Sequence, residues 1–132
     1  MKVYRVEHSR CGLGPFMGPK SSSLNNYMST LIDQDYFPIS EFDDKFGHDD
    51  YFGVATLQGI IQWFATIPEL IQMLHDEGYH IAIYRTKSIS YKDKNQLTFR
   101  ISSAKLVKIL SLETLHDHQD LHERIHQDEI TD

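Results

Sequence analysis

The stretch Tyr79-His80-Ile81-Ala82-Ile83-Tyr84-Arg85-Thr86 decides the fold. Its side chains alternate, with Ile81, Ile83 and Arg85 on one side and His80, Ala82 and Tyr84 on the other. Alternation with a period of two, in a run rich in β-branched and aromatic residues, is typical of a β-strand. Gly78, directly before it, is the residue type that commonly follows the end of a helix. We therefore expect a helix that ends at this point and a strand over residues 79–86.

Alternating side chains and turn residues also occur on both sides of this stretch. Further strands are expected near residues 2–8, 51–55, 96–101 and 104–112. The polar residues 87–95 are expected to form a turn between strands, and residues 33–50 an irregular loop.

Three helices are expected between the strands. Ser23 can cap a short one that carries Leu24, Tyr27, Met28, Leu31 and Ile32 on its apolar side. Thr56 caps a helix over residues 57–65, and Thr66 with Glu69 forms a capping box that opens another over residues 67–77. Trp63 should be at least partly buried, and the inner faces of these two helices are Ile60, Ile61, Phe64, Leu70, Ile71 and Leu74.

Strands at both ends with helices between them predict an α+β fold, with a mainly antiparallel sheet, two central helices and a C-terminal helical tail. We divide the chain into a single domain over residues 1–112 and an acidic, His-rich helix or tail over residues 113–132. The tail has few apolar residues, so we expect that removing residues 117–132 leaves the domain folded.

Composition narrows the class of protein. The chain has 132 residues, 40% of them hydrophobic, and a single cysteine, Cys11, which excludes a disulfide framework. The longest apolar stretch, residues 59–71, is interrupted by Gln62, Pro68 and Glu69, and the first residues lack the apolar run of a signal peptide. We expect a cytoplasmic protein with no membrane association.

The net charge of −6 is unevenly distributed. Residues 33–50 contain seven acids against Lys45, and residues 113–132 contain seven acids against Arg124. Residues 85–108 contain seven basic residues against Asp93. Either these segments face each other or water, or an acidic face meets a basic partner surface. Direct nucleic-acid binding is not expected of a chain that is acidic overall.

Two further features could carry chemistry. His118, His122 and His126 share one helical face, which suits either a metal site or a solvated, pH-responsive face; we assign no metal. Cys11 lies in a Gly/Pro loop near His8, but no third group is identifiable to orient a catalytic pair.

The end of the first strand is a more specific candidate. Arg5, Glu7 and His8 run directly into a loop that contains Gly12 and Gly14. Glycine permits close approach to the backbone, and arginine offers a fork of donors, so this strand end could hold an anionic or ribosyl group. The alternative is an Arg5–Glu7 pair without a ligand.

The order of these segments resembles that of small ADP-ribosyltransferase-like domains. The similarity rests on Tyr4-Arg5, on Tyr51-Phe52-Gly53-Val54-Ala55-Thr56, on His80–Tyr84, on Gln96–Phe99 and on Lys105–Ile109. The resemblance implies NAD or a related nucleotide as ligand. It gives catalytic positions to Arg5, Thr56 and Gln96, and cofactor contacts to Arg5, His8, Tyr51 and Phe52.

Gln96 stands where such transferases carry a catalytic glutamate. Glutamine can bind a ribose hydroxyl but supplies no negative charge to the transition state, so the resemblance implies weak transfer or binding alone. The opening residues and the stretch from Gly53 to Phe64 also resemble small proteins of phages and bacterial mobile elements.

Two functions follow as hypotheses. One is an ADP-ribosyltransferase-like phage domain that binds NAD and modifies or blocks a host or defence protein. The other is a non-enzymatic acidic inhibitor or adaptor whose Asp43, Asp44, Asp49 and Asp50 occupy the basic, nucleic-acid-binding surface of a partner protein.

Overall fold

The computed structural model describes residues 1–34, 36–37, 50–64, 66–92 and 96–116. Their elements run in the order β1 (Lys2–His8), α1 (Ser22–Asp33), β2 (Asp50–Gly53), α2 (Leu57–Phe64), α3 (Pro68–Asp76), β3 (Tyr79–Arg85), β4 (Ile89–Lys92), β5 (Leu97–Arg100), η1 (Ile101–Ser103), β6 (Lys105–Ser111) and η2 (Leu112–His116). The α+β class is confirmed.

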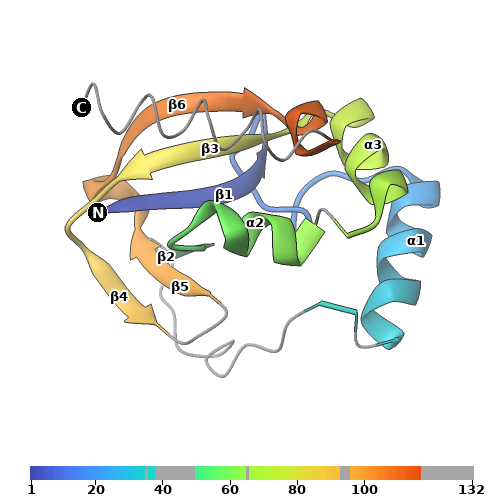
Figure 1. The fold of residues 1–132 in the computed structure, drawn as a ribbon, viewed down its shortest axis with the longest axis horizontal. Helices are drawn as coiled ribbons and strands as arrows, with labels where there is room; N and C mark the ends of the chain where they lie inside the picture. Colours follow the sequence, from blue (N-terminus) through green and yellow to red (C-terminus); the bar gives the residue numbers. More distant parts are fainter. Residues whose placement is uncertain (35, 38–49, 65, 93–95, 117–132) are drawn as a thin grey trace.

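Within these ranges the strands form two antiparallel sheets, ordered β1-β3-β6 and β2-β5-β4 (Figure 1). The sheets meet at one bridge, where Tyr4 and Val54 exchange two backbone hydrogen bonds of 2.8 Å. The strands therefore divide between two sheets, because β2 pairs along its length with β5, and backbone pairing with β1 is limited to the bridge at Val54, the residue after β2.

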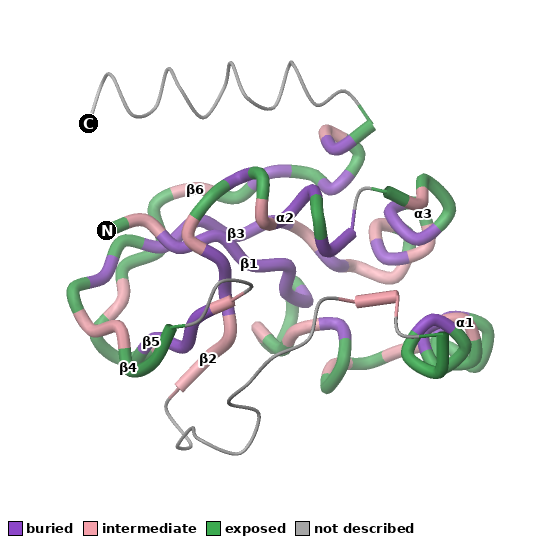
Figure 2. The backbone as a smooth tube through the Cα atoms, turned by 60° about the horizontal axis from the view of Figure 1, so that its bottom comes forward, coloured by how far each residue is buried: buried purple, intermediate pink, exposed green. Residues whose placement is uncertain are grey.

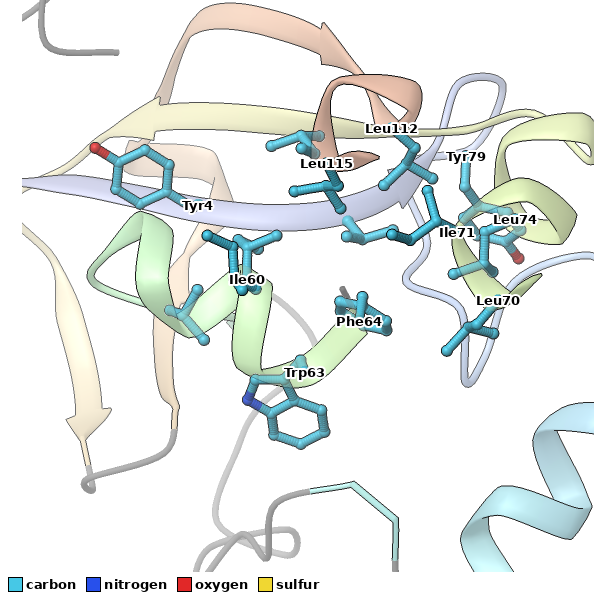
Figure 3. Close-up of a cluster of buried hydrophobic side chains, with 14 of the residues drawn as sticks. Tyr4, Ile60, Trp63, Phe64, Leu70, Ile71, Leu74, Tyr79, Leu112 and Leu115 are labelled. Atoms are coloured by element: carbon cyan, nitrogen blue, oxygen red, sulfur yellow. The ribbon is translucent and has the colours of Figure 1, made fainter. Parts of the chain in front are cut away.

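The first core cluster lies between the helices and one face of the β1-β3-β6 sheet (Figure 3). The six inner-face residues expected on α2 and α3 are all buried, and Trp63 is 8% exposed. Tyr4 and Val6 of β1 and Ile81 and Ile83 of β3 face them from the sheet. The helical periodicity read from the sequence is thus confirmed.

The second cluster covers the opposite face of that sheet. Val3, Ala82 and Tyr84 pack there against Leu97 and Phe99 of the β2-β5-β4 sheet. Because both faces of β1 and β3 are covered, these two strands are buried along most of their length (Figure 2). This sandwich also buries the polar side chains that β1 carries on its second face.

Several sequence expectations at helix ends need correction. The N-cap of α1 is Ser21, not Ser23, and its hydroxyl accepts the Leu24 N–H at 3.2 Å; Ile32 is half-exposed rather than buried. The capping box at Thr66 is absent. Ile67 occupies the N-cap of α3 without a side-chain bond, because Pro68 at the first helical position has no N–H and a fixed φ suited to starting the helix.

Two other boundaries differ. Residues 87–95, expected to form a turn, contain strand β4. Its side chains are mostly exposed and polar, so the sequence pattern does not indicate a strand. After β6, η2 returns Leu112 and Leu115 to the first core cluster, so the packed chain continues past residue 112. The rest of the expected C-terminal helix, residues 117–132, lies outside the described residues. No helix in the described part combines the length and apolarity needed to cross a membrane.

Candidate functional site

The Arg5 side chain lies between the two sheets and is 6% exposed. Its Nε–H donates to Glu7 Oε1 at 2.9 Å, its Nη1 to the Phe52 carbonyl at 2.7 Å, and its Nη2 to the Gly12 carbonyl at 2.6 Å. The Tyr51 ring lies 4.6 Å from the guanidinium carbon, in cation–π geometry. Arg5 therefore joins β1, β2 and the Gly/Pro loop through a single buried cation.

Glu7 balances this charge. Its Oε1 and Oε2 accept the Tyr84 hydroxyl at 2.8 and 3.0 Å, and His80 Nε2 lies 3.9 Å from Oε2. Burial lowers the pKa of Arg5, and the neighbouring Glu7 carboxylate partly opposes this shift. Burial, followed by the hydrogen bond to Glu7, raises the pKa of Tyr84, so its hydroxyl stays protonated and donates.

The Gly/Pro loop is fixed against the end of β1. The Gly12 N–H donates to the His8 carbonyl at 2.9 Å, and the His8 N–H donates to the Leu13 carbonyl at 2.8 Å. Gly12 has φ of +73°, a conformation that glycine adopts without strain. The tight turn brings the Gly12 carbonyl to Arg5, so the loop takes up donors that a ligand would otherwise use.

His8 points away from this cluster, because strand alternation places it on the opposite face from Arg5 and Glu7. Its Nδ1 accepts the Arg10 N–H at 3.2 Å, so Nε2 carries the hydrogen and donates to the Glu77 carbonyl at 2.9 Å. The ring packs edge-on against Tyr79. His8 thus anchors the junction between α3 and β3, where Gly78 leaves room for it.

The other residues implied by the transferase resemblance are distributed around this region. Thr56 Oγ1 accepts the Gly59 N–H at 3.1 Å, as expected of a helix cap. Tyr51 and Phe52 contact Arg5 through a ring and a backbone carbonyl respectively. Gln96 is half-buried directly before β5. The structure therefore brings Arg5, Tyr51 and Phe52 together and gives His8 and Thr56 structural contacts elsewhere.

Of the four acids expected to bind a partner, Asp50 is described. It is half-buried at the start of β2 and accepts the Ser90 hydroxyl at 2.6 Å. The other three, Asp43, Asp44 and Asp49, lie outside the described residues, as do His118, His122 and His126. Cys11 is exposed.

Tyr84 and His80 are the members of the buried cluster that sequence reasoning missed. Both lie on the same side of the 79–86 strand as Ala82. Antiparallel pairing with β1 places His80 opposite Glu7 and Ala82 opposite Arg5. Pairing the two most regular strands in register would have indicated that this side carries the polar cluster.

Fold and site together define an α+β domain whose two sheets are joined through a buried Arg–Glu–Tyr cluster. Residues 1–113 match the family described as Bacteriophage T4 Y00F protein, and the chain belongs to this family. The phage part of the sequence resemblance is thereby confirmed. Comparison with curated proteins gave no match, and comparison with solved structures gave none either.

Proposed function

We propose that this phage-family protein acts without catalysis, as an acidic inhibitor or adaptor that binds a partner protein. One observation carries the proposal: Arg5, on which nucleotide recognition would depend, donates three hydrogen bonds within its own chain and is buried. A ligand phosphate would have to replace those acceptors and leave Glu7 with a buried, weakly compensated charge, which is unfavourable.

The charge distribution supports a partner protein with a basic surface. Seven acids and one lysine in residues 33–50 suit a basic protein surface, including one that otherwise binds nucleic-acid phosphates. Asp50 ties the end of this segment to β2 and, through Ser90, to β4. The segment is therefore anchored to the folded domain at its C-terminal end.

NAD or nucleotide binding is the second candidate. It is favoured by the gathering of the Arg5 guanidinium, the Tyr51 ring and the Phe52 backbone at one place, as the transferase resemblance implies. On this alternative Gln96 limits transfer, and Gln96→Glu raises NAD cleavage.

A capture experiment tests the proposal. The full chain is immobilised beside a variant in which Asp43, Asp44, Asp49 and Asp50 are all changed to Asn. The matched control changes Asp117, Asp120, Asp128 and Asp132 to Asn, which alters the net charge equally. We expect a host-cell protein to be retained by the wild type and the control and lost by the first variant, with binding that weakens steeply between about 0.05 and 0.2 M salt.

Equal retention by all three proteins would contradict the proposal. So would NAD-dependent stabilisation of the wild type without any protein partner. Circular dichroism of each variant establishes that it is folded before the comparison is made.

A further inference from the structure

We infer that the β1-β3-β6 sheet carries a binding surface for an acidic segment, and that its occupant is the chain's own C-terminal segment, residues 117–132. The surface is a row of three basic residues, Lys2, Arg85 and Lys105, called the basic row below. This surface is separate from the one in the proposed function, and the inference does not depend on that function.

Strand pairing places the basic row across one end of the sheet. Lys2 of β1 lies opposite Arg85 of β3, and Arg85 lies opposite Lys105 of β6. The start of β1, the end of β3 and the start of β6 meet at this end of the sheet (Figure 1). Residues directly opposite in antiparallel strands share a face and have Cβ atoms about 5 Å apart. The backbone register therefore holds three positive side chains close together.

Neighbouring groups add positive charge at the same place. Lys108 of β6 lies opposite the residue two positions before Arg85, so it shares the face of the basic row. The Met1 ammonium donates to the Thr86 carbonyl at 3.1 Å, directly after β3. Among the residues of β1, β3 and β6 the one acid is Glu7, near the far end of β1, and α2 carries no charge. Like charges so close destabilise one another, so the basic row favours an anionic partner.

The C-terminal segment has the complementary charge. Residues 117–132 contain one arginine, Arg124, and six acids, a net charge of 1 − 6 = −5 with histidine neutral. These acids are Asp117, Asp120, Glu123, Asp128, Glu129 and Asp132. Because the segment belongs to the same chain, its effective concentration at the sheet is on the order of millimolar. An external polyanion is repelled by the chain's overall charge of −6, so the chain's own segment is favoured as the occupant.

The segment is long enough to reach the basic row. It begins after His116, the last residue of η2, which packs against α3 and the first core cluster. From there the basic row lies at the other end of β6, and Ser111 and Lys105 are about 20 Å apart along that strand. Sixteen residues span about 24 Å as an α-helix and roughly 50 Å when extended. Either conformation covers the length of β6.

Zero-length crosslinking of the full chain tests the assignment. A carbodiimide joins a lysine amine to an adjacent carboxylate as an amide, and mass spectrometry identifies the two residues. In the monomer at about 0.05 M salt we expect Lys105 and Lys108 to be joined to acids of residues 117–132. The yield should fall by about threefold or more at 1 M salt, because salt screens exposed charges. Lys20 and Lys92, which lie elsewhere on the domain, are the controls and should not be joined to this segment.

Limited trypsin digestion gives a second measurement, because residues 117–132 contain one trypsin site, after Arg124. Replacing Arg85 and Lys105 together by Gln should release the segment and accelerate this cleavage by about threefold or more. The matched control replaces Arg10 and Lys92 by Gln, since both are exposed and the net charge changes equally. We expect the control to be cleaved at the wild-type rate. Circular dichroism of each variant establishes that it is folded.

Three results would overturn the assignment. The first is crosslinking of residues 117–132 to the control lysines instead of Lys105 and Lys108, or crosslinking only between two copies of the chain. The second is an equal rate of cleavage after Arg124 in the wild type, the variant and the control. The third is retention of the wild type, but not of the Arg85/Lys105 variant, on immobilised heparin at about 0.15 M salt. That result would show that the basic row binds an external polyanion.

Discussion

The Tyr84 hydroxyl donates to both carboxylate oxygens of Glu7, at 2.8 and 3.0 Å, across the pairing of β1 with β3. The same carboxylate accepts Arg5 Nε at 2.9 Å. Glu7 thus has a cation on its own strand and a neutral donor on the neighbouring strand. The buried charges are satisfied within the chain, as buried polar groups require.

Replacing Tyr84 by Phe should destabilise the domain by about 1.5–3 kcal/mol, because a hydrogen bond to a buried charged group is lost. Urea unfolding of the two proteins measures the difference. The control is Tyr36→Phe, because the buried Tyr36 hydroxyl has no hydrogen-bond partner among the described residues, and a loss within about 0.5 kcal/mol is expected. Equal effects at the two positions would show that Tyr84 contributes nothing through Glu7.

Gly78→Ala should lower the unfolding free energy by about 1–3 kcal/mol from the backbone alone. Gly78 has φ of +97°, and an added Cβ would come within 2.9 Å of His8 Nε2, which would disturb its bond to the Glu77 carbonyl. Gly14→Ala is the matched control, since its Cβ meets nothing closer than 3.6 Å. A Gly78→Ala protein as stable as the Gly14→Ala protein would contradict this account of the α3–β3 turn.

Stability should fall between pH 10 and about pH 12 through Tyr79. Burial raises the pKa of Tyr79 to about 12, and its hydroxyl donates to the Pro19 carbonyl at 2.7 Å. The unfolded tyrosine loses its proton near pH 10 and the folded one near 12. The folded state therefore binds more protons in this window, and stability decreases as the pH rises. The slope is about 1.4 kcal/mol per pH unit for one such group.

Urea unfolding at pH 9, 10 and 11 measures this decline. Tyr79→Phe should be less stable at pH 9, because the hydrogen bond is absent, and should show a smaller decline above pH 10. An undiminished decline in Tyr79→Phe would assign the alkaline effect to other tyrosines, among them Tyr84, whose pKa is also raised.

Truncations directly after and directly before η2 should affect the stability of the domain in opposite ways. A chain that ends at His116 keeps Leu112 and Leu115, both fully buried in the first core cluster, and should remain folded. A chain that ends at Ser111 loses both side chains. Each lost leucine should cost about 2–5 kcal/mol. Thermal melts of the two truncated proteins measure this. A large loss of stability at the His116 truncation would show that residues 117–132 belong to the core.

Periodicity was sufficient to predict most of the fold. The 79–86 alternation and the apolar positions of α2 and α3 depend on local sequence, and the structure confirms them. Strand β4 could not be predicted, because it owes its order to pairing with β5 and buries little of its own surface. The division into two sheets is likewise a long-range outcome, set by the pairing of β2 with β5, which lie more than 40 residues apart in the sequence.

The candidate site also has a part that the local sequence predicts and a part that depends on long-range contacts. A strand-end Arg5 beside glycines could be read from the sequence, together with the alternative of an Arg5–Glu7 pair. Its remaining acceptors are the carbonyls of Gly12 and Phe52, and backbone carbonyls give no signal in the side-chain sequence. Only the three-dimensional arrangement shows that the guanidinium binds groups of its own chain.

The central claim is that Arg5 belongs to the framework of the domain and does not form part of a nucleotide site. Thermal unfolding of the wild type and of Arg5→Ala, each with and without NAD, tests it most directly. We predict that NAD leaves both melting temperatures unchanged and that Arg5→Ala melts at least about 10 °C lower. Breaking a buried ion pair by removing one partner costs about 3–5 kcal/mol, which is sufficient for that decrease. A rise in the wild-type melting temperature with NAD, abolished in an Arg5→Ala protein that is otherwise as stable as the wild type, would contradict the claim.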